Sequence, residues 1–259
     1  MRVALVHALT CCTQNLTRMS KIQTMLFILA LLTLFIPVMG QSDIQFQREM
    51  SQLFDERKVV TSSKTYSFDE IEGSPYLTSD YHKSRIIMQG GDTIRNIRLR
   101  YNMYHNNFEF IHDQSLYQIK EPHRVRRIEH LGKLFVFHTL REATGKRKKG
   151  FLVKLAEGPC SLYKHYRVEF EKPEEAQTPF HQDKPPRFDE EDPDYYLKPE
   201  DQQYPEKVVS LRKGKFLNFF GPLEKELKDY INEQDIDLKE EKDLIRFVEY
   251  YNSKYAKNK

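Results

Sequence analysis

The clearest pattern in this chain is an alternation of apolar and polar residues with a period of two. In residues 96–104, NIRLRYNMY, the apolar side chains of Ile97, Leu99, Tyr101 and Met103 face one way, while asparagines and arginines face the other. Because successive side chains of a strand point to opposite faces, this alternation predicts a half-buried strand with a wetted, basic face.

The same pattern continues on both sides of this stretch. Strands are predicted over 85–88, 108–112, 116–120, 125–130, 133–140, 151–156 and 161–170. Short turns with Gly or Asn separate them, which favours an antiparallel meander. We therefore predict a mainly β (α+β) fold, in which an antiparallel meander forms a sandwich or a partly open barrel, with a C-terminal two-helix hairpin.

Near the C-terminus the period changes to that of a helix. After a predicted final strand at 208–211, Pro222 is a natural first helical residue, and Leu227 and Ile231 begin an apolar stripe. A second helix is predicted from Asp237. Two short helices are not stable alone, so we expect this hairpin to dock on the β region.

Between the β region and the hairpin lies a segment rich in proline and acidic residues. It contains seven of the chain's twelve prolines. Proline removes a backbone donor and restricts the residue before it, so we expect an extended connector with no more regular structure than an isolated edge strand at 195–197. The predicted organisation is a leader and signal peptide (1–40), an N-terminal helical segment (41–58), an antiparallel β domain (59–170), the connector (171–206), and a final strand with the helical hairpin (207–259).

The leader contains the only long apolar run of the chain, from Met25 to Met39. About 15 residues are too few to span a bilayer, which needs roughly 20. Lys21 precedes the run and Gly40 follows it, which is typical of a secretory signal peptide whose true start is Met19. A retained membrane anchor is the alternative. We predict an exported protein, periplasmic or associated with the outer membrane or cell surface, with no transmembrane span after cleavage.

Removal of residues 1–40 changes both the charge and the thiol content. The full chain has 41 basic and 38 acidic residues, and the leader contains three of the basic ones and no acidic one. The mature chain is therefore neutral, which gives no reason to expect a nucleic-acid partner. Cys160 becomes its single cysteine, so no internal disulfide is expected.

The charges of the mature chain are segregated. Residues 81–168 contain 18 basic and 7 acidic side chains, whereas residues 169–205 contain 4 basic and 12 acidic ones. One interpretation is that the acidic segment lies back across the basic region. The other is that a basic face binds an anionic partner, such as lipopolysaccharide, a polysaccharide or a membrane surface.

The densest basic stretch is REATGKRKKG, at 141–150, between two predicted strands. Its cations are the candidate residues for an anionic partner: Arg141, Lys146, Arg147, Lys148 and Lys149. We name these five residues the hairpin patch. The alternative is a solvated turn that opposes aggregation.

Motifs for catalysis or cofactor binding are absent from the sequence. There is no HExxH, CxxC, GxSxG or phosphate-binding glycine loop. His112, His130 and His138 lie on or at the ends of predicted strands, where they would form a metal site only by converging. Cys160 and His165 are expected on opposite faces of a strand, about 16 Å apart. The acidic run 189–194 lacks the glycine of a calcium loop, which favours a solvated turn. We predict no catalytic, cofactor-binding or metal residues.

Three groups of residues carry a resemblance to a known family. They are GSPYL at 73–77, the pattern IxLRYNxY at 97–104 followed by FEF at 108–110, and DLI at 243–245 with EYYN at 249–252. In these the chain resembles exported β-rich proteins of unassigned function that are common in Bacteroidota. The resemblance implies a Gram-negative envelope setting and implies no activity.

Three functions stay open from the sequence. The leading hypothesis is a non-enzymatic envelope protein that acts as a binding or structural module, because export and a β scaffold occur without a catalytic motif. The alternative is a carrier of a small apolar ligand inside a β-barrel cavity. The third is a hydrolase whose catalytic residues are dispersed along the chain.

Overall fold

The computed structural model describes residues 53–56, 70–112, 114–174 and 183–255. The predicted leader and most of the N-terminal segment therefore lie outside the described residues. Where that segment is described, Leu53 is helical, as predicted, whereas Phe54–Glu56 forms strand β1. Its pairing explains the difference, because Phe54 lies opposite Ile119 and packs its ring edge-on against Phe110 at 4.5 Å.

Strands dominate the described residues, as predicted. They are β1 (Phe54–Glu56), β2 (Glu72–Gly73), β3 (His82–Met88), β4 (Thr93–Asn102), β5 (Asn107–His112), β6 (Ser115–Ile119), β7 (Val125–His130), β8 (Lys133–Arg141), β9 (Arg147–Ala156), β10 (Cys160–Glu171), β11 (Arg187–Pro199) and β12 (Glu206–Lys207). The mainly β class and the strands predicted between residues 85 and 170 are confirmed, with ends that move by a few residues.

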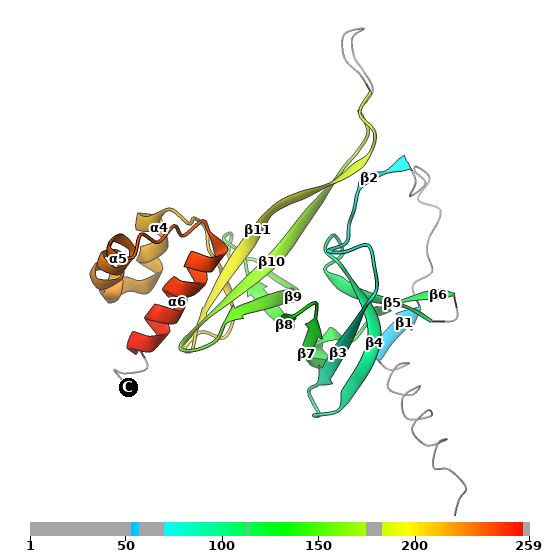
Figure 1. Cartoon of the computed structure of the whole chain (residues 1–259), viewed down its shortest axis with the longest axis horizontal. Coiled ribbons are helices and arrows are strands. Elements are labelled where there is room, and N and C mark those ends of the chain that lie inside the picture. The colour runs from blue at the N-terminus through cyan, green and yellow to red at the C-terminus, as the bar shows by residue number, and fades with distance from the viewer. Residues whose placement is uncertain (1–52, 57–69, 113, 175–182, 256–259) are drawn as a thin grey trace, which may run out of the picture. The chain divides into compact units, whose positions relative to one another are not determined.

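The strands form one sheet that is partly closed into a ring. Its order is β1-β6-β5-β4-β3-β7-β8-β12-β11-β10-β9, and β9 also pairs with β8. That last pairing closes β8, β12, β11, β10 and β9 into a ring, while the other strands continue it as an open sheet (Figure 1). Most pairs are antiparallel, but β12 pairs with β8, and β2 with β11, in parallel. The partly open barrel is thus the closer of the two predicted architectures.

A large cluster of aliphatic and aromatic side chains forms the main core, which lies against β1 and β3 to β10. Tyr101, Phe108, Phe135 and Phe151 are almost completely buried there. Phe108 meets the rings of Phe135 and Phe151 edge-on at 5.0 and 5.3 Å, an arrangement that aromatic quadrupoles favour. The apolar face predicted for residues 97–103 is buried in this core.

The acidic, proline-rich segment differs from its prediction. Residues 187–199 form strand β11, which pairs with β10 along most of its length. Proline is tolerated at a bulge or at a strand end, where no ladder hydrogen bond is lost. Pro193 lies where the register shifts between Glu191 and Asp194, and Pro199 is the last paired residue. The prolines therefore fall where the strand needs no donor.

The predicted final strand at 208–211 is also wrong. The strand β12 is formed by Glu206 and Lys207 instead, and it follows directly after Pro205, whose carbonyl accepts a hydrogen bond from the Arg141 N–H at 2.9 Å. Val208 and Leu211 then pack against the helices. Burial of these two side chains explains why the chain leaves the sheet.

The predicted helical hairpin is confirmed and is preceded by two shorter helices. The helices are α4 (Lys213–Leu217), the 3-10 helix η3 (Asn218–Leu223), α5 (Glu224–Glu233) and α6 (Glu241–Tyr255), with a further 3-10 turn η2 (Pro122–Arg124) earlier in the chain. Tyr230 of α5 stacks on Tyr250 of α6 with ring centroids 3.6 Å apart. Figure 1 shows the helices gathered beside the ribbon of β10 and β11.

The helices dock on the outer face of β10 and β11. Leu162 and Leu197 from these strands share one apolar cluster with Phe216, Leu244 and Phe247 from the helices. A side-chain amide completes the contact: Asn252 accepts the Cys160 N–H at 2.7 Å and donates to the Cys160 carbonyl at 2.9 Å. The amide therefore bonds to the edge of β10 as a neighbouring strand would.

Candidate functional site

The hairpin patch lies at the end of the β8–β9 hairpin. Arg141 ends β8 and Lys146 lies in the turn, and all five cations are exposed. The turn is shorter than predicted, because Arg147, Lys148 and Lys149 already belong to β9. These three side chains therefore alternate between the two faces of the strand.

Ion pairs divide the patch into two groups. Lys148 pairs with Glu142 at 2.9 Å, and Arg141 lies 3.9 Å from Glu206. The Arg147 guanidinium lies over the Tyr204 ring, 4.8 Å from its centroid. Within the described ranges, Lys146 and Lys149 have no ion-pair partner, so their charges face solvent.

The acidic segment neutralises little of this basic region. Among the described residues, the ion pairs that join the two segments both involve Arg167, which contacts Glu169 at 2.6 Å and Asp194 at 3.9 Å. Arg187 instead pairs within the acidic segment, with Glu171 and Asp189. The hairpin patch meets the acidic segment through Arg147, whose guanidinium lies over the Tyr204 ring, while Lys146 and Lys149 stay without an ion-pair partner in the described ranges.

A second group of cations lies on the outward face of β3, β4 and β7. Arg85 is directly opposite Arg95, and Lys83 is directly opposite Arg98. Glu129 of β7 pairs with Arg85 at 3.0 Å and with Arg127 at 3.4 Å. A hollow of about 390 Å³ is lined there by Lys83, Ser84, Arg85, Arg95, Asn96 and Glu129. The sequence predicted the basic face of 96–104 and its hairpin with 85–88, but not the register that sets Arg85 opposite Arg95.

The interior of the ring holds two histidines beside five apolar or aromatic residues. Val136, Leu140, Leu152, Tyr163 and Tyr196 pack together and are buried. The His138 ring meets Tyr163 edge-on at 5.1 Å, and the His165 ring meets Tyr196 at 6.4 Å. These side chains pack against one another inside the ring, and the apolar carrier stays a prediction.

Burial is the main cause of the lowered pKa of both histidines in the ring, His138 and His165. It lowers the pKa of His138 to about 4, with a further contribution from Lys198 and Lys154. It lowers the pKa of His165 to about 4 as well, with Lys148 adding to the effect. Both imidazoles are therefore neutral at pH 7.

A charged network lies beside His165 where the β8–β9 hairpin approaches β11 and β12. Glu142 accepts a hydrogen bond from the Tyr196 hydroxyl at 2.8 Å and pairs with Lys148. Burial raises the pKa of Glu142, but the hydrogen bonds from Lys148 and Tyr196 outweigh it and lower that pKa overall. Lys207 links Glu142 to Asp194, at 3.9 and 2.8 Å.

The three histidines on predicted strands do not come together. His130 lies in the main core, where its Nδ1 and the Ser84 hydroxyl are 2.8 Å apart. His138 faces the ring interior, and His112 is exposed on β5. Among the described residues, no group of three or more His, Cys, Asp or Glu side chains is arranged to hold a metal ion.

Cys160 is a buried thiol. Burial raises its pKa to about 12, which keeps the sulfur protonated and a poor nucleophile. The acidic run 189–194 lies within β11 and is not the solvated turn that we predicted.

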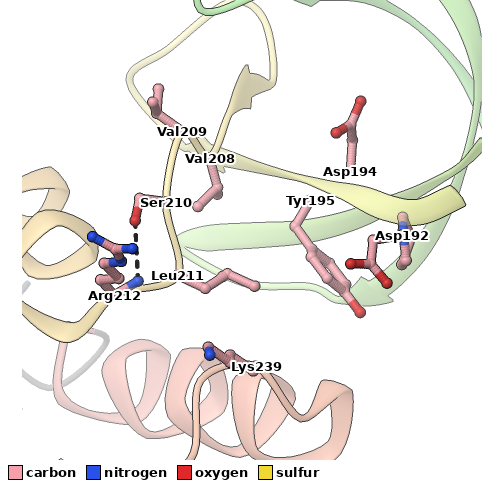
Figure 2. A pocket seen from close by; sticks show the side chains of 10 residues that line it. Asp192, Asp194, Tyr195, Val208, Val209, Ser210, Leu211, Arg212 and Lys239 are labelled. Atoms are coloured by element: carbon pink, nitrogen blue, oxygen red, sulfur yellow. Dashed lines mark hydrogen bonds between the residues drawn. The ribbon is translucent and has the colours of Figure 1, made fainter.

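A groove of about 550 Å³ separates β11 from the segment that leads to the helices (Figure 2). Asp192 and Tyr195 line it from β11, residues 208–212 from the opposite side, and Lys239 from the loop before α6. The Tyr195 hydroxyl donates to Glu241 at 3.1 Å, and Glu241 also pairs with Lys164 at 2.6 Å. Of the lining side chains, Asp194 pairs with Lys207 at 2.8 Å, and the Ser210 hydroxyl accepts the Arg212 N–H at 3.2 Å.

Four residues of the family resemblance, Tyr76, Arg100, Asn102 and Glu109, form one cluster with Tyr81. The Arg100 guanidinium lies between the rings of Tyr76 and Tyr81, 3.5 and 4.5 Å from their centroids, and contacts Glu109 at 3.4 Å. Asn102 donates to the fully buried Glu109 at 3.0 Å. Burial, together with Glu109, raises the pKa of Tyr76 to about 12. The face predicted to be wetted is therefore covered at Arg100 and Asn102.

Comparison of the chain with family models, with curated proteins and with solved structures finds no match. The family resemblance therefore stays a prediction. No helix in the described part of the chain is both long enough and apolar enough to cross a membrane.

Proposed function

We propose that this protein is an exported, non-enzymatic envelope protein that binds an anionic component of the envelope through the hairpin patch. One observation carries the proposal: Lys146 and Lys149 are exposed at the hairpin and have no ion-pair partner among the described residues. The chain as a whole has nearly balanced charges, so an unpaired basic site is a local feature.

The geometry of the hairpin supports contact with an extended anionic surface. A turn of five residues, 142–146, places Lys146 at the extreme end of the two strands. Lys149 and Arg147 point to the same face of β9, because residues two apart share a face. A surface with regularly spaced phosphates would meet all three cations at once, and each would add about 1 kcal/mol of attraction.

Binding to lipopolysaccharide, with purified protein in a sedimentation assay, tests the proposal. The double variant Lys146→Glu/Lys149→Glu is expected to weaken binding at least about tenfold, because two attractions become repulsions. High salt should weaken the wild-type interaction in the same direction, since the charges are exposed.

A matched control separates this site from net charge. Lys225 and Lys228 are exposed on α5, and Lys225→Glu/Lys228→Glu changes the total charge equally. This control should bind within about twofold of the wild type. Equal weakening by both double variants, or binding insensitive to salt, would reject the hairpin patch as the site.

A further inference from the structure

We propose that the hollow between β3 and β4 is a second, separate site, which binds a phosphate group. The site consists of Lys83, Arg85 and Arg95 around the bulge at Asn96. It differs from the hairpin patch in its strands, in its concave shape and in the size of the ligand that fits it.

The register of β3 and β4 places cations opposite one another. Arg85 lies directly opposite Arg95, and Lys83 directly opposite Arg98. Like charges placed opposite each other on neighbouring strands destabilise a sheet. Two such pairs lie side by side here, and an anion bound between them would offset the repulsion of both.

The cations that line the hollow have few acidic neighbours among the described residues. Glu129 is the carboxylate that lines the hollow, and it is shared between Arg85 at 3.0 Å and Arg127 at 3.4 Å. Lys83 and Arg95 have no ion-pair partner in the parts of the chain that the structure describes. Their positive charges therefore act on any anion that enters.

The backbone of β4 is irregular at the hollow. Ser84 is paired with Ile97 and Arg85 with Arg95, so Asn96 has no partner on β3 and forms a bulge. Its φ of 58° lies in the left-handed region, which asparagine tolerates better than most residues. Bulges redirect side chains, and this one places an exposed amide beside two cations. The hollow of about 390 Å³ has room for a phosphate or pyrophosphate group.

The chemistry of the side chains favours phosphate as the anion. Arginine offers a planar set of donors that matches the oxygens of a phosphate, and lysine adds a point charge. Arg85 and Arg95 approach from neighbouring strands, while Lys83 follows on the same face of β3. Such a group is present both in free phosphate compounds and in the headgroups of anionic lipids.

Titration with inorganic pyrophosphate, followed by NMR of the backbone amides, tests the site directly. The Asn96 signal should move on binding, and Arg95→Gln should weaken the affinity at least about fivefold, because a charge-assisted hydrogen bond is lost. The hairpin variant Lys146→Glu/Lys149→Glu should bind pyrophosphate as the wild type does. No movement at Asn96, or equal weakening in the hairpin variant, would overturn the proposal.

Thermal unfolding provides a readout that a merely structural role would not reproduce. Without phosphate, Arg95→Gln should unfold at the same or a higher temperature than the wild type, because it relieves the repulsion from Arg85. At the same concentration, pyrophosphate should raise the unfolding temperature of the wild type more than that of the variant. A variant that is destabilised without the ligand, and stabilised by it as much as the wild type, would contradict the site.

Vesicles distinguish the two sources of phosphate. Binding to phosphatidylglycerol vesicles that is weakened by Arg95→Gln assigns the site to a lipid headgroup. Pyrophosphate binding without vesicle binding assigns it to a free phosphate compound. Failure of both probes rejects the site, and it leaves the hairpin patch to be judged by its own variants.

Discussion

The main core and the ring interior use alternate residues of the same strands, yet they differ in chemistry. On β8, Phe135 faces the main core, whereas His138 points into the ring. On β9, Phe151 faces the main core and Leu152 the ring. The main core combines aliphatic side chains with interlocking aromatic rings, while the ring interior combines five apolar or aromatic residues with two histidines and a charged network.

This difference shows that strands can enclose a region of the protein whose side chains are not all apolar. The main core is stabilised mostly by apolar area removed from water, and it also encloses His130, whose pKa burial lowers to about 4. The ring interior removes His138 and His165 from water, and it keeps them neutral at pH 7. Both regions therefore contribute to the dependence of stability on pH, and substitutions of their apolar and imidazole side chains should produce different responses.

The largest expected effect is in the main core. Phe108→Ala removes a fully buried ring that meets Phe135, Phe151 and His130 edge-on. Urea unfolding at pH 7 should show a loss of about 3–5 kcal/mol, the usual cost of such a cavity. Tyr104→Ala, at a side chain that is 46% exposed, should change the free energy of unfolding by no more than about 0.5 kcal/mol. A similar loss in both variants would contradict the assignment of the main core.

The next effect depends on acid and belongs to the ring interior. His165 has a pKa of about 4 in the folded state, below the value of about 6.5 in an unfolded chain. The unfolded state therefore binds more protons between these values, and the free energy of unfolding falls as the pH drops from about 6.5 to about 4. In His165→Gln, this fall should shrink by about 3 kcal/mol, since each pKa unit corresponds to about 1.4 kcal/mol.

Urea unfolding measured across that pH range checks the expectation, with His123→Gln on the surface as a matched control. His130, in the main core, has a pKa lowered to about 4 by burial and by His82. Its contribution should persist in the ring variant. An unchanged pH profile in His165→Gln would show that the ring does not exclude water from this imidazole.

The smallest effect concerns the hydroxyl of Tyr196. In Tyr196→Phe the hydrogen bond to Glu142 is lost, but Glu142 keeps its ion pair with Lys148. Denaturation should therefore show a loss of only about 1 kcal/mol at pH 7. Tyr104→Phe, on the surface, should change nothing measurable. A loss as large as that of Phe108→Ala would mean that the network, and not apolar packing, holds the ring together.

Local pattern was enough to place the strands of residues 82–171, because period-two alternation and Gly or Asn turns act over short stretches. The segment 187–199 was missed because its prolines and acids argue against a strand. Pairing with β10 overrides that preference, since Pro193 and Pro199 fall where the ladder requires no donor. Composition alone identified the hairpin patch. Which of its lysines is paired depends on Glu142, because the folded hairpin places this carboxylate beside Lys148 and not beside Lys146.

By itself, the sequence determined the mainly β class, the apolar face of β4, the helical hairpin and the cations at 141–149. Each follows from residues that lie near one another in the chain. The tertiary structure decided which strands meet. The short parallel contact between Glu206 and Arg141 completes the ring, and the pairing of β3 with β7 places Arg85 beside Glu129. These contacts join residues that no local period relates, so they depend on the packing of the whole sheet.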